Sequence, residues 1–134
     1  MTTVTEAPAV TARHGFDSLE EETRLDGLPI EGPLPAWLQG SLIRTGPAKW
    51  EVGDRAMNHW FDGLAMLHRF AFANGAVTYM SRFLEGDAFR AAKSTGKISY
   101  AEFATDPCRT LFGRVASWFD PRFTDNCCVN VMDY

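Results

Sequence analysis

Residues 64–84 read LAMLHRFAFANGAVTYMSRFL, and this stretch decides the fold that the sequence predicts. Asn74-Gly75 at its centre is the residue pair typical of a two-residue β-hairpin turn, because both turn positions need a positive φ. Aromatic, β-branched and other apolar residues lie on both sides of the pair, with arginines between them. The stretch therefore predicts two antiparallel strands joined by a tight turn.

The turn also predicts the register of the hairpin. One face receives the large apolar pairs Phe72–Val77, Phe70–Tyr79 and Met66–Phe83. The other face receives the pairs Ala71–Thr78, Arg69–Met80 and Leu67–Arg82. Because a single register gathers the aromatic residues on one side and the arginines on the other, turn and pattern agree.

His68 falls on the aromatic face of this hairpin, opposite Ser81. Two interpretations stay open. His68 is either a core histidine, hydrogen-bonded to Ser81 or to a backbone carbonyl, or it is a residue of a functional site.

Shorter elements are predicted on either side of the hairpin. Residues 35–40 predict a turn anchored by Trp37, followed by a short strand over 41–45 that Gly46-Pro47 closes. After the hairpin, Asp87 as N-cap predicts a helix over 88–94 with Gly96 just past its end. Residues 99–102, Ser-Tyr-Ala-Glu, match a capping box and predict a second short helix.

The two ends of the sequence give weaker signals. The opening residues MTTVTEAPAVTARHGF lack the charged-then-apolar pattern of a secretory signal, and residues 1–34 are expected to form a mobile arm and an extended lead-in. Residues 124–126 predict a turn, and residues 127–134 predict a strand at which the sequence stops.

Composition excludes some classes of function. A net charge of −4 without a basic stripe argues against nucleic acid as a partner. The cysteines are Cys108, Cys127 and Cys128, an odd number without a C-x-x-C pair, which favours a reduced, cytoplasmic setting. No apolar run approaches the ~20 residues that a membrane-spanning helix needs.

Residue spacing gives no complete catalytic centre. The histidines are His14, His59 and His68, and their spacing matches no metal-site pattern, including the H-x-x-D of residues 59–62. There is no G-x-S-x-G motif and no phosphate-binding glycine loop. Taken alone, the residues indicate a soluble, aromatic-rich, β-containing domain.

Residues 108–119 allow two interpretations. Leu111, Phe112, Val115, Trp118 and Phe119 recur at helical spacing, with arginines off that stripe. The stripe indicates either a helix packed on the protein's own core or a helix in a membrane interface, where Phe112, Trp118 and Phe119 would contact lipid.

Four motifs, in order, carry a family resemblance. Residues 38–47 resemble the opening L-x-G-x-L-x-R-x-G-P of the carotenoid cleavage oxygenases, and residues 59–68 are similar to their H-x-F-D-G-x-A-x-x-H stretch. Residues 79–83 resemble their Y-x-x-R-F, and residues 124–131 their T-D-N-x-x-V-N-V. The resemblance marks these motif residues as structural: Arg44, Gly46, Pro47, His59, Phe61, Asp62, Gly63, His68, Asp125 and Asn126.

This resemblance implies an all-β fold, namely the amino-terminal fragment of a seven-bladed β-propeller with short helical insertions. Residues 35–134 would form the partial propeller domain, truncated at its C-terminus, because seven blades of roughly 40–50 residues exceed this chain. The family's Fe(II) is held by four histidines, none of which matches a residue here. The first is expected after Tyr134, in a T-A-H-P-type segment, so the resemblance implies no catalytic or metal residue in this fragment.

Residues 106–109, Asp-Pro-Cys-Arg, resemble the branch that contains the β-carotene oxygenases and the retinal-pigment isomerohydrolase. That branch is associated with membrane contact in the following Phe-rich region, and Phe103 is its candidate for contact with the substrate cavity. The sequence departs from the family at Ala104, where glycine is usual, and in its short link to Asp106.

The function implied by the resemblance is an Fe(II)-dependent dioxygenase that cleaves a conjugated C=C bond of a carotenoid or apocarotenoid with O₂, giving carbonyl products. A retinoid isomerohydrolase-like relative is one alternative, and an inactive truncated product is another. The fragment alone is expected to be inactive. The expected location is cytoplasmic, with peripheral membrane association left open.

Overall fold

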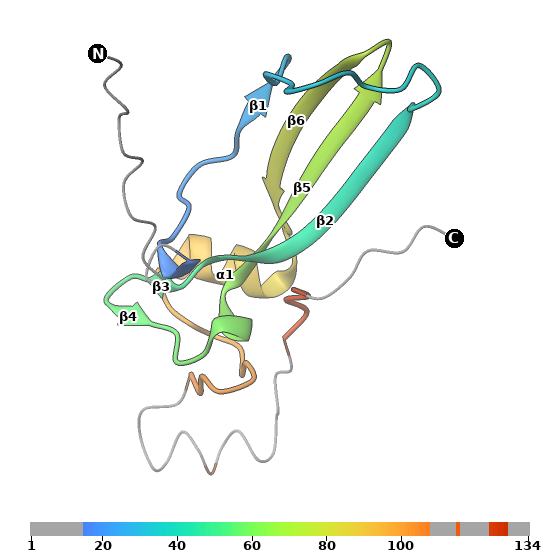
Figure 1. The fold of residues 1–134 in the computed structure, drawn as a ribbon. Helices are drawn as coiled ribbons and strands as arrows, with labels where there is room; N and C mark the ends of the chain where they lie inside the picture. Colours follow the sequence, from blue (N-terminus) through green and yellow to red (C-terminus); the bar gives the residue numbers. More distant parts are fainter. Residues whose placement is uncertain (1–14, 108–114, 116–123, 129–134) are drawn as a thin grey trace, which may run out of the picture.

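The computed structural model describes residues 15–107, 115 and 124–128, and an antiparallel four-stranded sheet dominates them. The strand order is β1-β6-β5-β2. The bounds are Arg24–Leu25 for β1, Gly40–Lys49 for β2, Leu64–Ala73 for β5 and Ala76–Phe83 for β6. Strands β2, β5 and β6 curve together, and helix α1, Asp87–Thr95, lies at one end of them (Figure 1).

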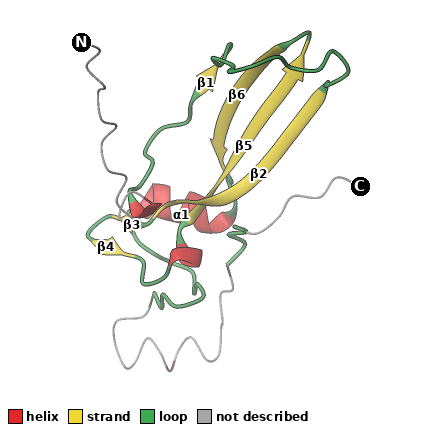
Figure 2. Ribbon diagram, viewed as in Figure 1, coloured by secondary structure: helices red, strands yellow, loops and turns green. Residues whose placement is uncertain are grey.

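Three small elements lie at the same end as α1. Strands β3, Glu51–Val52, and β4, Arg55–Ala56, form a two-stranded sheet, and the 3-10 helix η2, Trp60–Asp62, leads directly into β5. Figure 2 shows that strands and loops account for most of the described chain. The described part is therefore mostly β, and its sheets do not close into a propeller.

The β5–β6 hairpin has the predicted register, which is confirmed pair by pair from Met66–Phe83 to Ala73–Ala76. Asn74 has a φ of 51° and Gly75 a φ of 76°, as the turn type requires. Strand β2 then pairs with the free side of β5, and β1 pairs with β6.

Strand β2 is longer than predicted. The prediction that Gly46-Pro47 closes the strand at Thr45 is wrong, since β2 continues to Lys49 with a register shift between Pro47 and Lys49. The physical reason is its place in the sheet. A proline lacks the N–H that an inner strand must donate, but β2 is an edge strand, where that loss is tolerated.

Helix α1 is confirmed, with a difference at its start. Gly96 ends the helix in the left-handed conformation at a φ of 63°, as predicted. The predicted cap Asp87 is instead the first helical residue, and the N-cap Gly86 has no side chain to offer. The cap comes from Asp125, whose carboxylate accepts hydrogen bonds from the N–H groups of Asp87 at 2.5 Å and Ala88 at 2.9 Å.

Other predicted local elements differ from the structure wholly or in part. Residues 99–102 form no helix, because the Glu102 carboxylate accepts a hydrogen bond from Thr124 rather than from a helix N-terminus. The turn at 35–38 exists, with the Leu38 N–H bonded to the Pro35 carbonyl, but Trp37 is 79% exposed and anchors nothing there. Residues 124–128 form neither a regular turn nor a strand.

Several predictions fall outside the described residues. The membrane-contact residues Phe112, Trp118 and Phe119 are among them, as are residues 1–14 of the expected arm and residues 129–134 of the expected last strand. The remaining lead-in, residues 15–34, runs along the sheet and contributes β1.

The core lies where the sheet meets α1 and the β3–β4 hairpin. One buried cluster consists of Val52, Leu64, Ala92 and Ile98, and the other of Ala48, Met66 and Phe83. Phe89 of α1 packs against both clusters, and its ring stacks on Phe83 with centroids 4.8 Å apart. α1 therefore joins the two clusters into a continuous apolar contact.

Candidate functional site: aromatic rings around a buried aspartate

The stretch from His59 to Gly63 folds into η2 and places three side chains differently. His59 is the N-cap, and its Nδ1 accepts a hydrogen bond from the Phe61 N–H at 3.2 Å. Phe61 projects outward and is 52% exposed, whereas Asp62 is fully buried. Gly63 is required at the next position, because a Cβ there would lie 2.7 Å from Trp50 Nε1 and 2.8 Å from Pro47 Cβ.

The buried Asp62 carboxylate holds a loop from far along the chain. It accepts hydrogen bonds from the Ala104 N–H at 3.1 and 3.2 Å and from the Thr105 hydroxyl at 2.6 Å. Thr105 is itself buried, and its Oγ1 accepts from the Asn58 N–H at 2.8 Å. These bonds fasten the 104–105 loop to Asn58, which precedes η2, and to Asp62, the last residue of η2.

Phe103 stands out from this fastened loop. Its ring is 76% exposed, with its centroid 5.0 Å from that of His59 and 6.1 Å from that of Phe61. We call His59, Phe61 and Phe103 the aromatic cluster. Its rings come from two segments about 40 residues apart, and they form an apolar surface next to a fully satisfied polar anchor.

Residues 124–128 also bind this region through hydrogen bonds, and we call them the clasp. The Asn126 side chain accepts from the Ala65 N–H at 2.8 Å and donates to the Gly63 carbonyl at 3.0 Å. Cys128 Sγ lies 3.1 Å from the same carbonyl, and burial together with the Glu102 carboxyl raises the pKa of its thiol to about 11. The clasp thus fixes the start of β5.

The pKa values of Asp125 in the clasp and of Glu102, which is bonded to the clasp, shift in opposite directions. Burial raises the pKa of Glu102, against a hydrogen bond from Thr124 Oγ1 at 2.8 Å. The N–H groups of Ala88 and Asp87 lower the pKa of Asp125, because they stabilise its charged form. Glu102 therefore gives up its proton less readily than Asp125.

The other motif residues gather on the sheet, around a groove of about 530 Å³. Arg44 lies directly opposite His68 across β2 and β5, and Gly46 and Pro47 follow it on β2. The prediction of a Ser81 partner for His68 is wrong. Its Nδ1 lies 2.7 Å from the Tyr79 hydroxyl, while Ser81 Oγ accepts from the Thr23 N–H.

The electrostatics of this groove disfavour the protonated form of His68. Burial lowers the pKa of His68, and the nearby Arg44 guanidinium lowers it further. The groove wall is otherwise apolar, with Leu25, Leu28, Trp60 and Phe70. The half-buried His68–Tyr79 pair is thus a hydrogen-bonded link within the sheet, 2.7 Å long.

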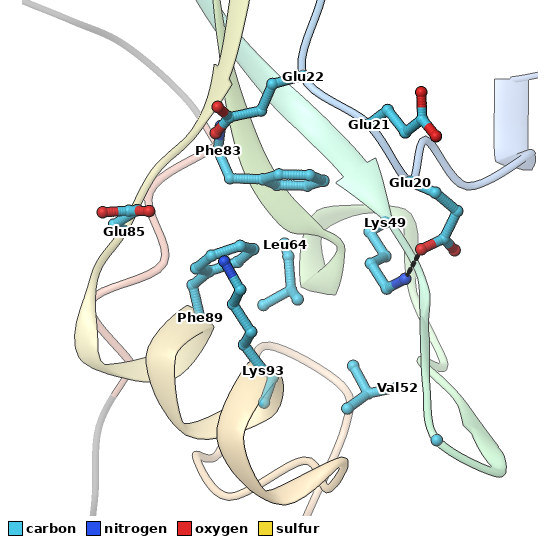
Figure 3. A pocket seen from close by; sticks show the side chains of 12 residues that line it. Glu20, Glu21, Glu22, Lys49, Val52, Leu64, Phe83, Glu85, Phe89 and Lys93 are labelled. Atoms are coloured by element: carbon cyan, nitrogen blue, oxygen red, sulfur yellow. Dashed lines mark hydrogen bonds and ion pairs between the residues drawn. The ribbon is translucent and has the colours of Figure 1, made fainter.

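A second hollow, of about 670 Å³, lies beside α1 (Figure 3). Its apolar part contains Val52, Leu64, Phe83 and Phe89, and its rim carries glutamates and two lysines. Lys49 is bonded to Glu20, and Lys93 lies 5.7 Å from the Phe89 ring centroid. The carboxylates of the rim do not converge on one point with other donors.

The described residues do not fit an iron centre. Among residues 15–107, 115 and 124–128 there is no group of three or more His, Cys, Asp or Glu side chains that could hold a metal ion. His59 and His68 are occupied with Phe61 and Tyr79, as described above. Within the same residues, no helix has the length and apolar character to cross a membrane.

Comparison with known proteins shows which family this chain resembles. The family model described as retinal pigment epithelial membrane protein matches residues 16–134. The chain belongs to this carotenoid oxygenase family. The predicted resemblance is confirmed, and the match includes both the aromatic cluster and the clasp.

Similar proteins in the family are named as carotenoid-cleaving enzymes. The chain is 44% identical over 110 residues to chicken (Gallus gallus) beta,beta-carotene 15,15'-dioxygenase. This alignment covers 77% of this chain and 21% of the relative. It is 42% identical over 126 residues to the human (Homo sapiens) mitochondrial carotenoid-cleaving dioxygenase, in an alignment that covers 87% of this chain and 22% of the relative. The chain thus spans about a fifth of the length of these relatives.

Solved structures agree with the sequence comparison. A cobalt-substituted Synechocystis apocarotenoid oxygenase is similar with a TM-score of 0.74 at 31% identity, covering 85% of this chain and 24% of that one. A chimera of that enzyme with the retinal pigment epithelial protein gives the same TM-score at 33% identity and the same coverage. The described β-rich part therefore resembles part of an apocarotenoid oxygenase.

The sequence predicted several residues of the site but not the hydrogen bonds that connect them. It named Asp62, Phe103, Asp125 and Asn126, but not that one carboxylate holds the loop of Phe103. Thr105, Asn58 and Cys128 were missed altogether. Thr105 had a signal, since residues 102–105, Glu-Phe-Ala-Thr, resemble a stretch in which the family usually has E-F-G-T, whereas Asn58 and Cys128 had none.

Proposed function

We propose that the protein is a carotenoid or apocarotenoid dioxygenase. It would cleave one conjugated C=C bond with O₂, so that each carbon of that bond receives one oxygen atom and two carbonyl products form. The family match over residues 16–134, together with relatives named as carotenoid-cleaving dioxygenases, supports this proposal. The sheet of the described residues would be part of a seven-bladed propeller.

Fe(II) belongs to the proposal through the family, and the solved relative described as cobalt-substituted supports a metal in such proteins. The described residues of this chain do not fit the ion, so we assign none of them to it. Their part in the reaction would be to bind and orient the polyene.

The aromatic cluster is the surface that we propose for that contact. Phe103 and Phe61 are more than half exposed, and their rings present an apolar π-surface at low conformational cost. A polyene is a long apolar chain of conjugated carbons, which such rings contact along their faces and edges. Phe103 would therefore line the substrate cavity.

The test begins with the protein purified from its source cells and measured by intact mass. It is then incubated with Fe(II), O₂ and β-carotene or an apocarotenal in detergent micelles, and the products are identified by mass spectrometry. Two shorter carbonyl products, each with one atom of labelled oxygen from ¹⁸O₂, are expected. An isomerised product of unchanged chain length would favour the isomerohydrolase alternative, and no conversion would favour the inactive product.

A matched pair of variants tests the role of Phe103. Phe103→Leu should slow the turnover of the polyene, whereas Trp37→Leu should not, because Trp37 is equally exposed but lies in the 35–38 turn. Equal effects of the two changes would count against a substrate contact at Phe103.

Membrane contact is a separate part of the proposal. Phe112, Trp118 and Phe119 would insert into the interface of a membrane while the protein stays on the cytoplasmic side. Co-sedimentation with phospholipid vesicles should fall when all three are replaced by Ser. Unchanged binding would remove this part.

A further inference from the structure

The Asp62 carboxylate is fully buried, and the donors that it meets are neutral. The Ala104 N–H and the Thr105 hydroxyl supply its side-chain hydrogen bonds, at 2.6 to 3.2 Å. A buried carboxylate is costly unless such bonds compensate it, and bonds to an ionised acceptor are about twice as strong as neutral ones. The loop at 104–105 is therefore tied to η2 by strong bonds to this carboxylate. Weaker neutral bonds from Asn58 to Thr105 Oγ1 at 2.8 Å and to the Ala104 carbonyl at 3.0 Å add to them.

The ring of Phe103 has little else to hold it. It is 76% exposed, so no core packing fixes its position, and its neighbours in space are the rings of His59 and Phe61. Those two rings belong to the turn that carries Asp62, while Phe103 directly precedes Ala104. The same carboxylate thus links the two segments that together form the aromatic cluster.

We propose that Asp62 is a positioning residue that sets the place of the Phe103 ring against His59 and Phe61. Its consequence for catalysis rests on the proposed function, because the ring orients a polyene only if Phe103 lines the substrate cavity. The positioning itself does not rest on it. Asp62 touches no substrate in this scheme and acts through the loop.

Hydrogen exchange tests the positioning without any assay of activity. In Asp62→Asn the acceptor loses its charge, which is worth about 1 kcal/mol per bond, so the Ala104 amide should exchange roughly 5-fold faster. The acceleration should stay within peptides covering 102–106. Peptides of α1 should exchange as in the unmodified protein, since a merely structural role would loosen them as well.

Changes at Thr105 keep the proposal testable if Asp62→Asn fails to fold. Thr105→Val removes the 2.6 Å hydroxyl donor to Asp62 at similar volume, together with the acceptor of the Asn58 N–H, and Thr105→Ser restores both. We expect faster exchange over 102–106 in the first and near-normal exchange in the second. Unchanged exchange at 102–106 in both Asp62→Asn and Thr105→Val would overturn the positioning, as would equal acceleration everywhere.

Kinetics on the same variants then separate positioning from function. If Phe103 contacts the polyene, Thr105→Val should raise KM about 2- to 10-fold with kcat nearly unchanged, from an aromatic contact of about 0.5–1.5 kcal/mol. Local exchange with this KM change supports both statements. Local exchange with an unchanged KM keeps the positioning and refutes the substrate contact.

Discussion

Replacing Asp125 by Ala should loosen helix α1 from its N-terminus. The first N–H groups of a helix have no partner inside it, and here the N-cap Gly86 has no side chain to supply one. Asp125 takes that role from 37 and 38 residues away, with acceptor distances of 2.5 Å to the Asp87 N–H and 2.9 Å to the Ala88 N–H. Its removal leaves both donors to water.

The size of the effect follows from capping. Loss of a side-chain cap costs about 0.5–2 kcal/mol, and the upper half of that range applies because two N–H groups share one carboxylate. A local loss of about 1–2 kcal/mol should accelerate amide exchange in α1 roughly 5- to 30-fold at pH 7. Exchange resolved on peptides of residues 87–95 is the measurement.

The sign of the pH dependence adds a second test. The N–H groups of Ala88 and Asp87 lower the pKa of Asp125 in the folded state. A lowered pKa means that the contribution is complete above the unfolded value of about 4 and is lost as pH falls through the folded value. The difference between the unmodified protein and Asp125→Ala should therefore shrink below about pH 4.

Asp87→Asn is the matched control, because it removes a carboxylate from the same helix turn. The Asp87 carboxylate bonds Arg90 on the surface rather than the helix N–H groups, so its loss should be small. If Asp125→Ala leaves exchange in α1 unchanged, or affects it no more than Asp87→Asn, the capping argument is refuted.

Gly63→Ala should lower the midpoint of thermal unfolding, because the added Cβ would lie 2.7 Å from an indole nitrogen, at a cost of about 1–3 kcal/mol in the free energy of unfolding. Gly46→Ala is the control and should be tolerated, since nothing lies within 4 Å of a Cβ at that position. Met66→Ala should cost about 2–5 kcal/mol in denaturant unfolding, as Met66 is fully buried in the core; a cost under 1 kcal/mol would contradict that packing. Iodoacetamide at pH 8 should label the exposed Cys127 before Cys128, whose thiol has a pKa of about 11 and stays protonated; equal labelling by peptide mass spectrometry would count against its burial.

The parts of the fold that could be predicted from the sequence are those with a local cause. The Asn74-Gly75 turn fixes a register in which every pair is determined by counting outward, and Gly96 ends α1 by its own conformation. Pro47 shows the limit. Whether a proline ends a strand depends on whether that strand lies at an edge, and the edge position of β2 is a property of the whole sheet.

The predicted capping box at 99–102 failed for the same kind of reason. Glu102 has the right spacing from Ser99, but its carboxylate is used by Thr124, 22 residues further on. Likewise His68 faces Ser81 in the predicted register, yet Tyr79 reaches it diagonally across the strands and Ser81 turns to the lead-in. A register says which residues are near, and the longer side chain then decides which of them bond.

The family motifs and the candidate contact surface share His59 and Phe61, but the buried motif residues have a different role for a physical reason. Asp62 and Asn126 differ in solvent exposure, but the side-chain oxygens of both accept hydrogen bonds from backbone N–H groups. Asp62 accepts from Ala104 and Asn126 accepts from Ala65. A side chain committed to the backbone in this way is not free to bind a substrate, and it fixes the loops on which other side chains stand. Phe103 is such a side chain, since it is exposed and its ring contacts the rings of His59 and Phe61. Motif side chains bonded to the backbone therefore locate the site. Its contacts come from exposed rings, namely those of the motif residues His59 and Phe61 and that of Phe103 on the fastened loop.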